Sequence, residues 1–143
     1  MSTLLGAQRA RPAALVPLAI AAVATLVGGY LHASLFHRGY AEVDVVGPLF
    51  LLNGIGSLVV VLALIFDRVV LFVVGSLAIG IGSIVSILIS HNASFFGFAE
   101  GTYDRRATII LAAEVVAVLF TVVGGLLALR RTAGADARAG VAA

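Results

Sequence analysis

The sequence predicts an all-α integral membrane protein, a four-helix transmembrane bundle with up-down-up-down topology. Of its 143 residues, 62 % are hydrophobic and only 11 % are charged, whereas soluble domains carry about 25 % charged residues. The apolar residues fall into four long segments, each close to the roughly 20 residues that a helix needs to cross the hydrocarbon core. This composition excludes a soluble globular enzyme, a disordered chain and a nucleic-acid-binding domain.

Charged residues bound the four predicted spans, which cover residues 12–36, 45–66, 69–90 and 107–129. Strands are excluded at these lengths, because an open sheet leaves backbone groups unpaired in lipid. Pro12 and Pro48 are suited to open the first and second helices, whereas Pro17 is expected to kink the first helix or reset its start. Only Asp67 and Arg68 separate the second and third spans, which predicts a tight antiparallel hairpin.

Four spans place the two predicted tails, residues 1–11 and 131–143, on the same side of the membrane. That side collects six of the nine arginines, and the opposite side has three, Arg38, Arg105 and Arg106. The positive-inside rule then predicts that both termini are cytoplasmic and that the protein is a multi-pass protein of the plasma (inner) membrane. We expect the first apolar segment to be retained, because it is longer than a signal peptide and no small-residue cleavage site ends it.

Small residues recur at every fourth position in three of the spans, and such stripes let helices approach closely in lipid. The second span has a weaker cluster, Gly54, Gly56 and Ser57. The stripes predict the packing faces of one compact bundle; the alternative is that some of them face another subunit. Their members are Ala21, Thr25, Gly29 and Ala33; Ala78, Gly82, Ser86 and Ser90; and Ala113, Ala117, Thr121 and Gly125.

Two segments that follow the odd-numbered spans resemble each other, and each runs from a histidine to an alanine-glutamate pair. One begins at His32 and ends at Glu42, and the other begins at His91 and ends at Glu100. A duplicated helical hairpin would produce this pattern, with two parallel repeats about an axis along the membrane normal. Chance similarity between two aromatic interface loops is the alternative.

Polar residues gather in the half of the membrane away from the termini. His32 lies about 30 Å along its helix, and His91 lies at a similar depth. Asn53 lies roughly 8 Å and Glu114 roughly 12 Å below the non-cytoplasmic surface. These four residues, Glu114, Asn53, His32 and His91, are the candidate ligand-binding or proton-binding residues.

Glu114 is the most informative of them, because an ionisable group inside a membrane is costly and is a functional candidate by default. It either carries a proton or binds a ligand, or it locks the bundle through a hydrogen bond to Asn53 or a histidine. His32 and His91 either extend toward interfacial water, or ligate a metal or haem jointly, or titrate together with Glu114. His37, Glu42, Glu100 and Asp104 are further candidates at the outer surface.

Chemical motifs are otherwise lacking in the sequence. It contains no cysteine, and no nucleophile elbow, Walker A or His-Glu-x-x-His sequence occurs. No catalytic residue is therefore predicted, and we expect no resident cofactor; haem or a metal held by His32 and His91 is the alternative.

The chain resembles a family of small four-span integral membrane proteins of actinobacteria. The resemblance rests on Tyr30-Leu31-His32, Gly47-Pro48-Leu49-Phe50-Leu51-Leu52-Asn53, Phe96-Gly97-Phe98-Ala99-Glu100 and Glu114. It implies a four-helix fold in an actinobacterial plasma membrane, and it brings no activity and no catalytic residue with it.

The function predicted from the sequence is that of a small non-enzymatic accessory or structural component of a membrane assembly. Its expected partners are the lipid bilayer and either further copies of itself or another membrane protein, and nucleic acid is excluded. One alternative is a protein that binds a cofactor, a metal, or a lipid or quinone at the outer-half polar site. A second alternative is a small proton-coupled transporter that depends on Glu114.

Overall fold

The computed structural model describes residues 12–99 and 102–129. These residues form four α-helices, α1 (Pro12–Phe36), α2 (Val46–Ile65), α3 (Val69–Asn92) and α4 (Arg105–Leu129), with one 3-10 turn, η1 (Tyr40–Glu42), between α1 and α2. All four helices are long and apolar enough to cross a membrane. The predicted fold class is confirmed, and every span end agrees to within two residues. The predicted tails lie outside the described residues.

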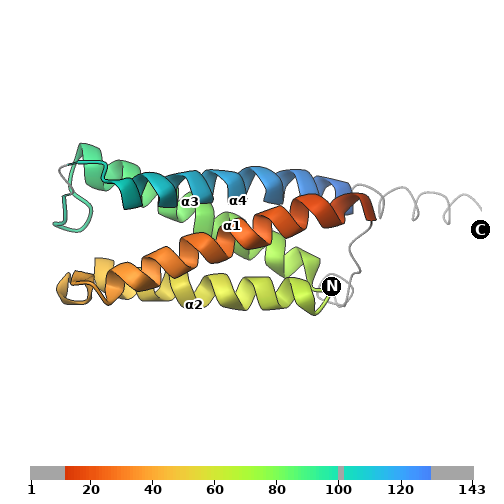
Figure 1. Ribbon diagram of the computed structural model, residues 1–143, viewed down its shortest axis with the longest axis horizontal. Helices are drawn as coiled ribbons and strands as arrows, with labels where there is room; N and C mark the ends of the chain where they lie inside the picture. The colour runs from red at the N-terminus through yellow and green to blue at the C-terminus, as the bar shows by residue number, and fades with distance from the viewer. Residues whose placement is uncertain (1–11, 100–101, 130–143) are drawn as a thin grey trace, which may run out of the picture.

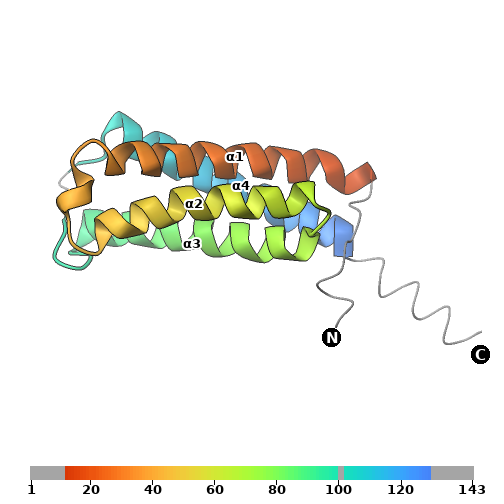
Figure 2. The ribbon, with the colours of Figure 1, turned by 90° about the horizontal axis from the view of Figure 1, so that it is seen from below.

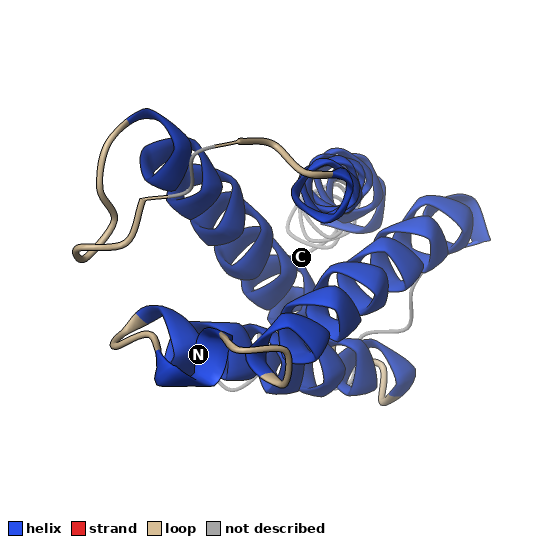
Figure 3. Ribbon diagram, turned by 60° about the vertical axis from the view of Figure 1, so that its left-hand side comes forward, coloured by secondary structure: helices blue, strands red, loops and turns tan. Residues whose placement is uncertain are grey.

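The helices run up and down along one long axis. Figure 1 shows the start of α1, the α2–α3 turn and the end of α4 at one end, which we name the turn end. The turn η1 and the α3–α4 loop lie at the other end, which we name the loop end. Helices α1 and α3 each pack against both α2 and α4, so the bundle is a ring in which α1 and α3 are diagonal. Figure 2 shows α2 beside α3 along the same axis, and Figure 3 shows helices joined by loops over the described residues.

Local sequence explains where the helices begin and turn. Pro12 begins α1, and Pro48 lies in the first turn of α2, where a missing N–H costs nothing. Helix α1 continues through Pro17, so the predicted reset of its start is wrong. Proline there removes only the bond to the carbonyl group of Ala13 in the first turn, which the rest of a long helix tolerates. Asp67 adopts a φ of 57° and closes the tight α2–α3 turn.

The buried faces of the helices follow a seven-residue period. In α3 the buried residues include Val69, Ser76, Ser83 and Ser90, a spacing that keeps side chains on one face because seven residues make almost two turns. The stripe predicted for α3 is wrong: Ala78 and Gly82 are exposed, and only Ser90 is buried. A four-residue step advances about 40° around a helix, so a long stripe of that period leaves the interior.

Three of the four members of each stripe predicted for α1 and α4 face the interior. Ala21, Thr25 and Gly29 are buried in α1, and Ala117, Thr121 and Gly125 are buried in α4, whereas Ala33 and Ala113 are half-buried. These two helices have the largest buried share, and α2 has the smallest. A stripe with a four-residue period shifts gradually around its helix. The buried faces of α1 and α4 are broad enough for most of the stripe to stay buried, whereas the narrower face of α3 is not.

The apolar core lies toward the turn end of the bundle. Leu18 is 1 % exposed and Phe72 is fully buried. Around them pack alanines of α1 together with Val61 and Val69 from the two sides of the α2–α3 turn. Apolar side chains fill the turn end of the bundle. The polar side chains that could serve a function therefore lie nearer the loop end.

Candidate functional site: a buried carboxyl group beneath an aromatic cavity

Each of the four helices contributes a polar side chain to a cluster in the half of the bundle nearer the loop end. His32 comes from α1, Asn53 from α2, Ser83 from α3 and Glu114 from α4. His32 and Glu114 are 4 % and 1 % exposed, and Ser83 is 8 % exposed. The site is therefore assembled by helix packing, and it lies inside the ring of helices.

The carboxyl group of Glu114 occupies space that two glycines leave open. A Cβ atom at Gly28 of α1 would lie 2.8 Å from Oε1, and one at Gly80 of α3 would lie 3.4 Å from Oε2. A larger residue at Gly28 would displace the carboxyl group, whereas one at Gly80 would first meet the side chain of Val118. Gly28 and Gly80 thus leave space for the Glu114 carboxyl group on the two helices that flank α4.

His32 lies directly beside this carboxyl group. Its Nδ1 atom donates a hydrogen bond to the carbonyl oxygen of Gly28 at 2.9 Å and lies 3.8 Å from Oε1 of Glu114. In the neutral ring this arrangement places the proton on Nδ1 and leaves Nε2 as an acceptor. The ring also meets Phe50 edge-on, with 5.1 Å between ring centroids.

Asn53 and Ser83 form the polar link between α2 and α3. Asn53 Nδ2 donates to Ser83 Oγ at 2.6 Å, and Ser57 Oγ donates to Asn53 Oδ1 at 3.4 Å. Both Asn53 and Ser83 lie close enough to Glu114 to interact with its carboxyl group. Even so, neither Oε1 nor Oε2 makes a well-formed hydrogen bond with any residue that the structure describes. Buried polar atoms in folded proteins are nearly always paired, so this carboxyl group calls for an explanation.

A cavity of about 640 Å³ opens beside these residues, and His32, Asn53 and Ser83 line it. Apolar side chains of α2 and α3 form most of its wall, and Tyr40, Phe95, Phe96 and Phe98 line the part that lies at the loop end. Glu114 is separated from the cavity by the side chains that line it. The cavity is thus apolar along its walls, aromatic at the loop end and polar on the side that adjoins the carboxyl group.

A tight turn in the α3–α4 loop brings Phe95, Phe96 and Phe98 to the loop end of the cavity. The backbones of Phe95 and Phe98 exchange two hydrogen bonds, of 2.8 and 3.0 Å. Phe96 and Gly97 both have positive φ, 51° and 82°, as a two-residue type I′ turn requires. Phe98 then packs on Tyr40 of η1 at 5.7 Å between ring centroids, which joins the two loops.

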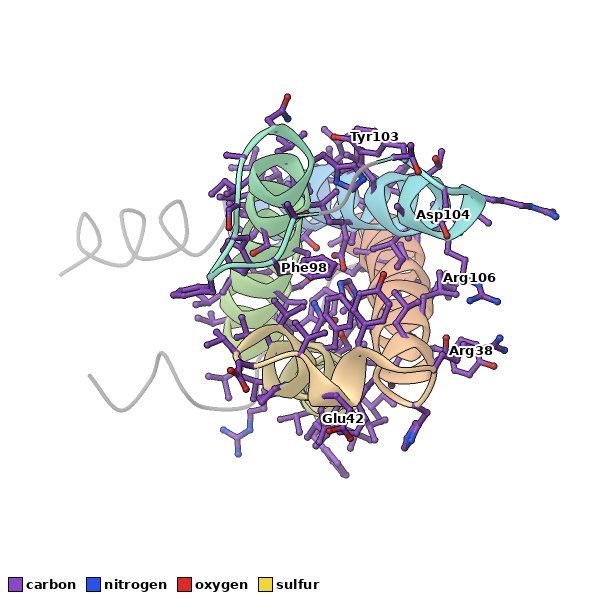
Figure 4. The ribbon with its side chains drawn as sticks, turned by 90° about the vertical axis from the view of Figure 1, so that its left-hand side faces the viewer. Arg38, Glu42, Phe98, Tyr103, Asp104 and Arg106 are labelled. Atoms are coloured by element: carbon purple, nitrogen blue, oxygen red, sulfur yellow. The ribbon has the colours of Figure 1, made fainter. Side chains whose placement is uncertain are left out.

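Charged residues lie at the rim of the cavity. Asp104 and Arg106 both line it, and Asp104 Oδ1 also accepts a hydrogen bond from the N–H group of Ala107 at 2.7 Å, which caps α4. In Figure 4, which looks onto the loop end, Phe98 lies near the centre of the bundle, whereas the guanidinium groups of Arg38 and Arg106 point away from it at the edge. Glu42 lies at the edge as well.

Three of the four residues predicted from the sequence lie together: Glu114, Asn53 and His32. His91 lies apart from them. Its Nδ1 atom bonds to the carbonyl oxygen of Ile87 at 2.9 Å, its Nε2 atom lies 3.3 Å from the carbonyl oxygen of Thr102, and its ring stacks on Tyr103. His91 thus fastens the α3–α4 loop to α3.

Metal ligation by the two histidines finds no support in this arrangement. Residues 12–99 and 102–129 contain no group of three or more His, Cys, Asp or Glu side chains that could hold a metal ion. The further candidates His37 and Glu42 are exposed, and Glu100 lies outside the described residues. Of these further candidates, Asp104 is the one that lines the cavity.

A second polar cluster, which the sequence analysis missed, lies about 10 Å deeper. Thr25 and Ser76 hydroxyl groups bond at 2.9 Å, and Ser76 and Thr121 hydroxyl groups bond at 3.0 Å. All three side chains are buried. Each lies seven residues from a member of the outer site on the same helix, His32, Ser83 and Glu114, and this spacing is visible in the sequence.

Comparisons with known proteins give no relative and no similar structure for this chain. No family model matches the chain, and neither curated proteins nor solved structures give a significant match.

Proposed function

We propose that this small integral membrane protein binds an amphipathic small molecule in the cavity at its loop end. The observation that carries the proposal is the cavity of about 640 Å³ with apolar walls and a few polar groups on one side. Binding sites for small molecules have this size and this composition, with a small number of polar groups that fix orientation.

The polar side of the cavity supplies both kinds of hydrogen-bonding group. With Nδ1 bound to Gly28, His32 offers the lone pair of Nε2 as an acceptor. Asn53 keeps a second N–H for a ligand, because only one donor is used by Ser83. These groups favour a ligand with an apolar body and a polar end, as a lipid or a quinone has.

Filling the cavity tests this proposal. Gly82 lines it, and a Cβ atom there would meet nothing within 4 Å, so Gly82→Phe can project a ring into the cavity. The probe is 4-fluoro-tert-butylbenzene, followed by fluorine NMR in lipid nanodiscs, with empty nanodiscs as the baseline. We expect saturable binding to the wild type and to Gly82→Ala, and loss of binding in Gly82→Phe. Equal binding by all three proteins, or by none, would contradict the proposal.

The interpretation as an accessory component of a membrane assembly stays a prediction. It is compatible with ligand binding, because a receptor subunit can do both. Proton-coupled transport is less well supported, since the apolar core around Leu18 and Phe72 fills the opposite end of the bundle. If transport occurs, Glu114→Gln is expected to abolish it.

A further inference from the structure

The carboxyl group of Glu114 has one described side chain that could serve as a positive partner, His32, and only when that ring is protonated. Of the described side chains packed around it, His32 is the titratable one, while Asn53 and Ser83 are neutral. An ionised carboxylate buried without counter-charge or hydrogen bonds is costly. With a neutral His32 beside it, the protonated carboxyl group is the less costly form while the cavity holds no cation.

The cavity that adjoins this group is lined by rings suited to bind cations. The ring of Phe50 lies beside that of His32. The ring centroids of Tyr40 and Phe50 are 5.1 Å apart, and those of Phe98 and Tyr40 are 5.7 Å apart. This continuous series of rings runs from the loop end of the cavity to His32, which lies beside the carboxyl group of Glu114. Aromatic faces attract ammonium groups most strongly when water is excluded.

The rim of the cavity does not oppose a cation. Asp104 and Arg106 both line it and carry opposite charges. The guanidinium group of Arg106 points away from the centre of the bundle (Figure 4). Electrostatic attraction inside the bundle then comes from Glu114 once its proton has left, because the charge of the carboxylate acts over several ångströms in a low-dielectric interior.

We propose that the cavity ligand is a lipophilic ammonium cation, and that it binds in exchange for the proton of Glu114. This inference rests on the proposed function, because it assigns a chemical class to the ligand of the same cavity. As the cation enters, the O–H bond of the carboxyl group breaks and the proton leaves to solvent. The positive charge of the cation replaces that of the proton, and no electrons are transferred.

A pair of matched probes separates charge from shape. The cation is 4-fluorophenyltrimethylammonium, and its neutral isostere is 4-fluoro-tert-butylbenzene, in which carbon replaces nitrogen. Both are measured by fluorine NMR with the full chain in nanodiscs, and proton release is followed in weakly buffered solution. Glu114→Gln removes the charge at nearly constant shape. Glu42→Gln is the matched control, because Glu42 is an exposed carboxylate at the same end of the bundle.

We expect Glu114→Gln to lower cation affinity at least tenfold, which corresponds to about 1.4 kcal/mol, and to leave the affinity for the neutral probe unchanged. Glu42→Gln should bind both probes as the wild type does. Cation binding should release protons from the wild type and from Glu42→Gln, but not from Glu114→Gln. In the wild type alone, cation affinity should fall as pH falls, because protons compete for the same carboxylate. This titration keeps the test valid even if Glu114→Gln fails to fold.

Two results would overturn the inference, and they are distinguishable. If the neutral probe binds but the cation binds no more weakly in Glu114→Gln and releases no protons, exchange at Glu114 is wrong while the proposed function stands. If neither probe binds to the wild type, the proposed function is wrong, and the inference fails with it.

Discussion

The contact between α1 and α2 at Gly29 allows a sharp test of the packing. A Cβ atom at Gly29 would lie 2.5 Å from Cβ and 2.6 Å from Oγ of Ser57, which is 1 % exposed. Because Cβ of Ser57 is fixed to the backbone of α2, a rotamer change cannot relieve the overlap. The helices must separate in Gly29→Ala, and overpacking of this kind costs about 1–3 kcal/mol.

The net effect follows from two opposing contributions. Alanine is favoured over glycine inside a helix by about 1 kcal/mol. Because the overlap is severe, we place its cost near the upper end of the range for overpacking, about 3 kcal/mol. After the gain in helix propensity is subtracted, we expect Gly29→Ala to lower the free energy of unfolding by about 2 kcal/mol. Gly82→Ala is the control, because its Cβ atom would meet nothing within 4 Å. It gains the helix propensity alone, so the two variants should differ by about 3 kcal/mol.

Unfolding with sodium dodecyl sulfate in mixed micelles measures this difference, with near-ultraviolet circular dichroism as the signal. Both variants change glycine to alanine in the interior of a membrane helix, so effects on the unfolded chain cancel in the comparison. If Gly29→Ala proves as stable as Gly82→Ala, α1 and α2 do not pack closely at Gly29, and the reasoning is refuted.

Three further predictions concern the deeper cluster, the cap of α4 and the topology. Ser76→Ala removes two hydroxyl–hydroxyl hydrogen bonds, each worth about 0.6 kcal/mol in a membrane protein, so unfolding in mixed micelles should show a loss of roughly 1 kcal/mol. Ser86→Ala, which removes a bond within its own helix, should change stability by less than about 0.5 kcal/mol; equal losses would contradict the bridging role of Ser76. Asp104→Ala should lower stability by about 1 kcal/mol through loss of the cap, whereas Asp104→Asn should retain it, and the reverse order would exclude capping. Alkaline phosphatase fused after Asp44 should be active in cells and inactive when fused after Leu129, and the opposite pattern would contradict cytoplasmic termini.

The fold could be predicted because the bilayer imposes a length on each helix. Charged residues such as Asp67 and Arg106 cannot enter hydrocarbon cheaply, so they fix the helix ends to within a turn. The rotation of each helix about its axis was harder to predict. Apolar residues face both lipid and protein, and hydrophobicity therefore does not mark the interior face of a membrane helix.

Rotation also explains which of the predicted residues lie together. The rise per residue places His32, Asn53 and Glu114 at comparable depths, and all three lie in the site. His91 has a similar depth but lies one residue beyond the buried Ser90. One residue corresponds to about 100° around the helix, which turns His91 out of the interior face. The counterpart of His32 on α3 is therefore Ser90, and depth alone could not distinguish the two.

The cavity itself could not be predicted, because it depends on how the loops fold back. Tyr40 and Phe98 are far apart in sequence, and each belongs to a different loop. Their contact requires the positive φ angles at Phe96 and Gly97. Aromatic residues near a membrane interface also occur without any cavity, so their presence in the sequence does not identify a binding site.

The two polar clusters are related by a seven-residue spacing along α1, α3 and α4, but they connect different sets of helices. Thr25, Ser76 and Thr121 connect α1, α3 and α4 in the deeper cluster, whereas α2 contributes Asn53 only to the outer one. Helix α2 is also the least buried of the four. Three helices are thus held together beneath the cavity independently of α2, which forms one wall of it. A displacement of α2 would therefore break no hydrogen bond of the deeper cluster, although it would disturb the apolar core, to which α2 contributes Val61.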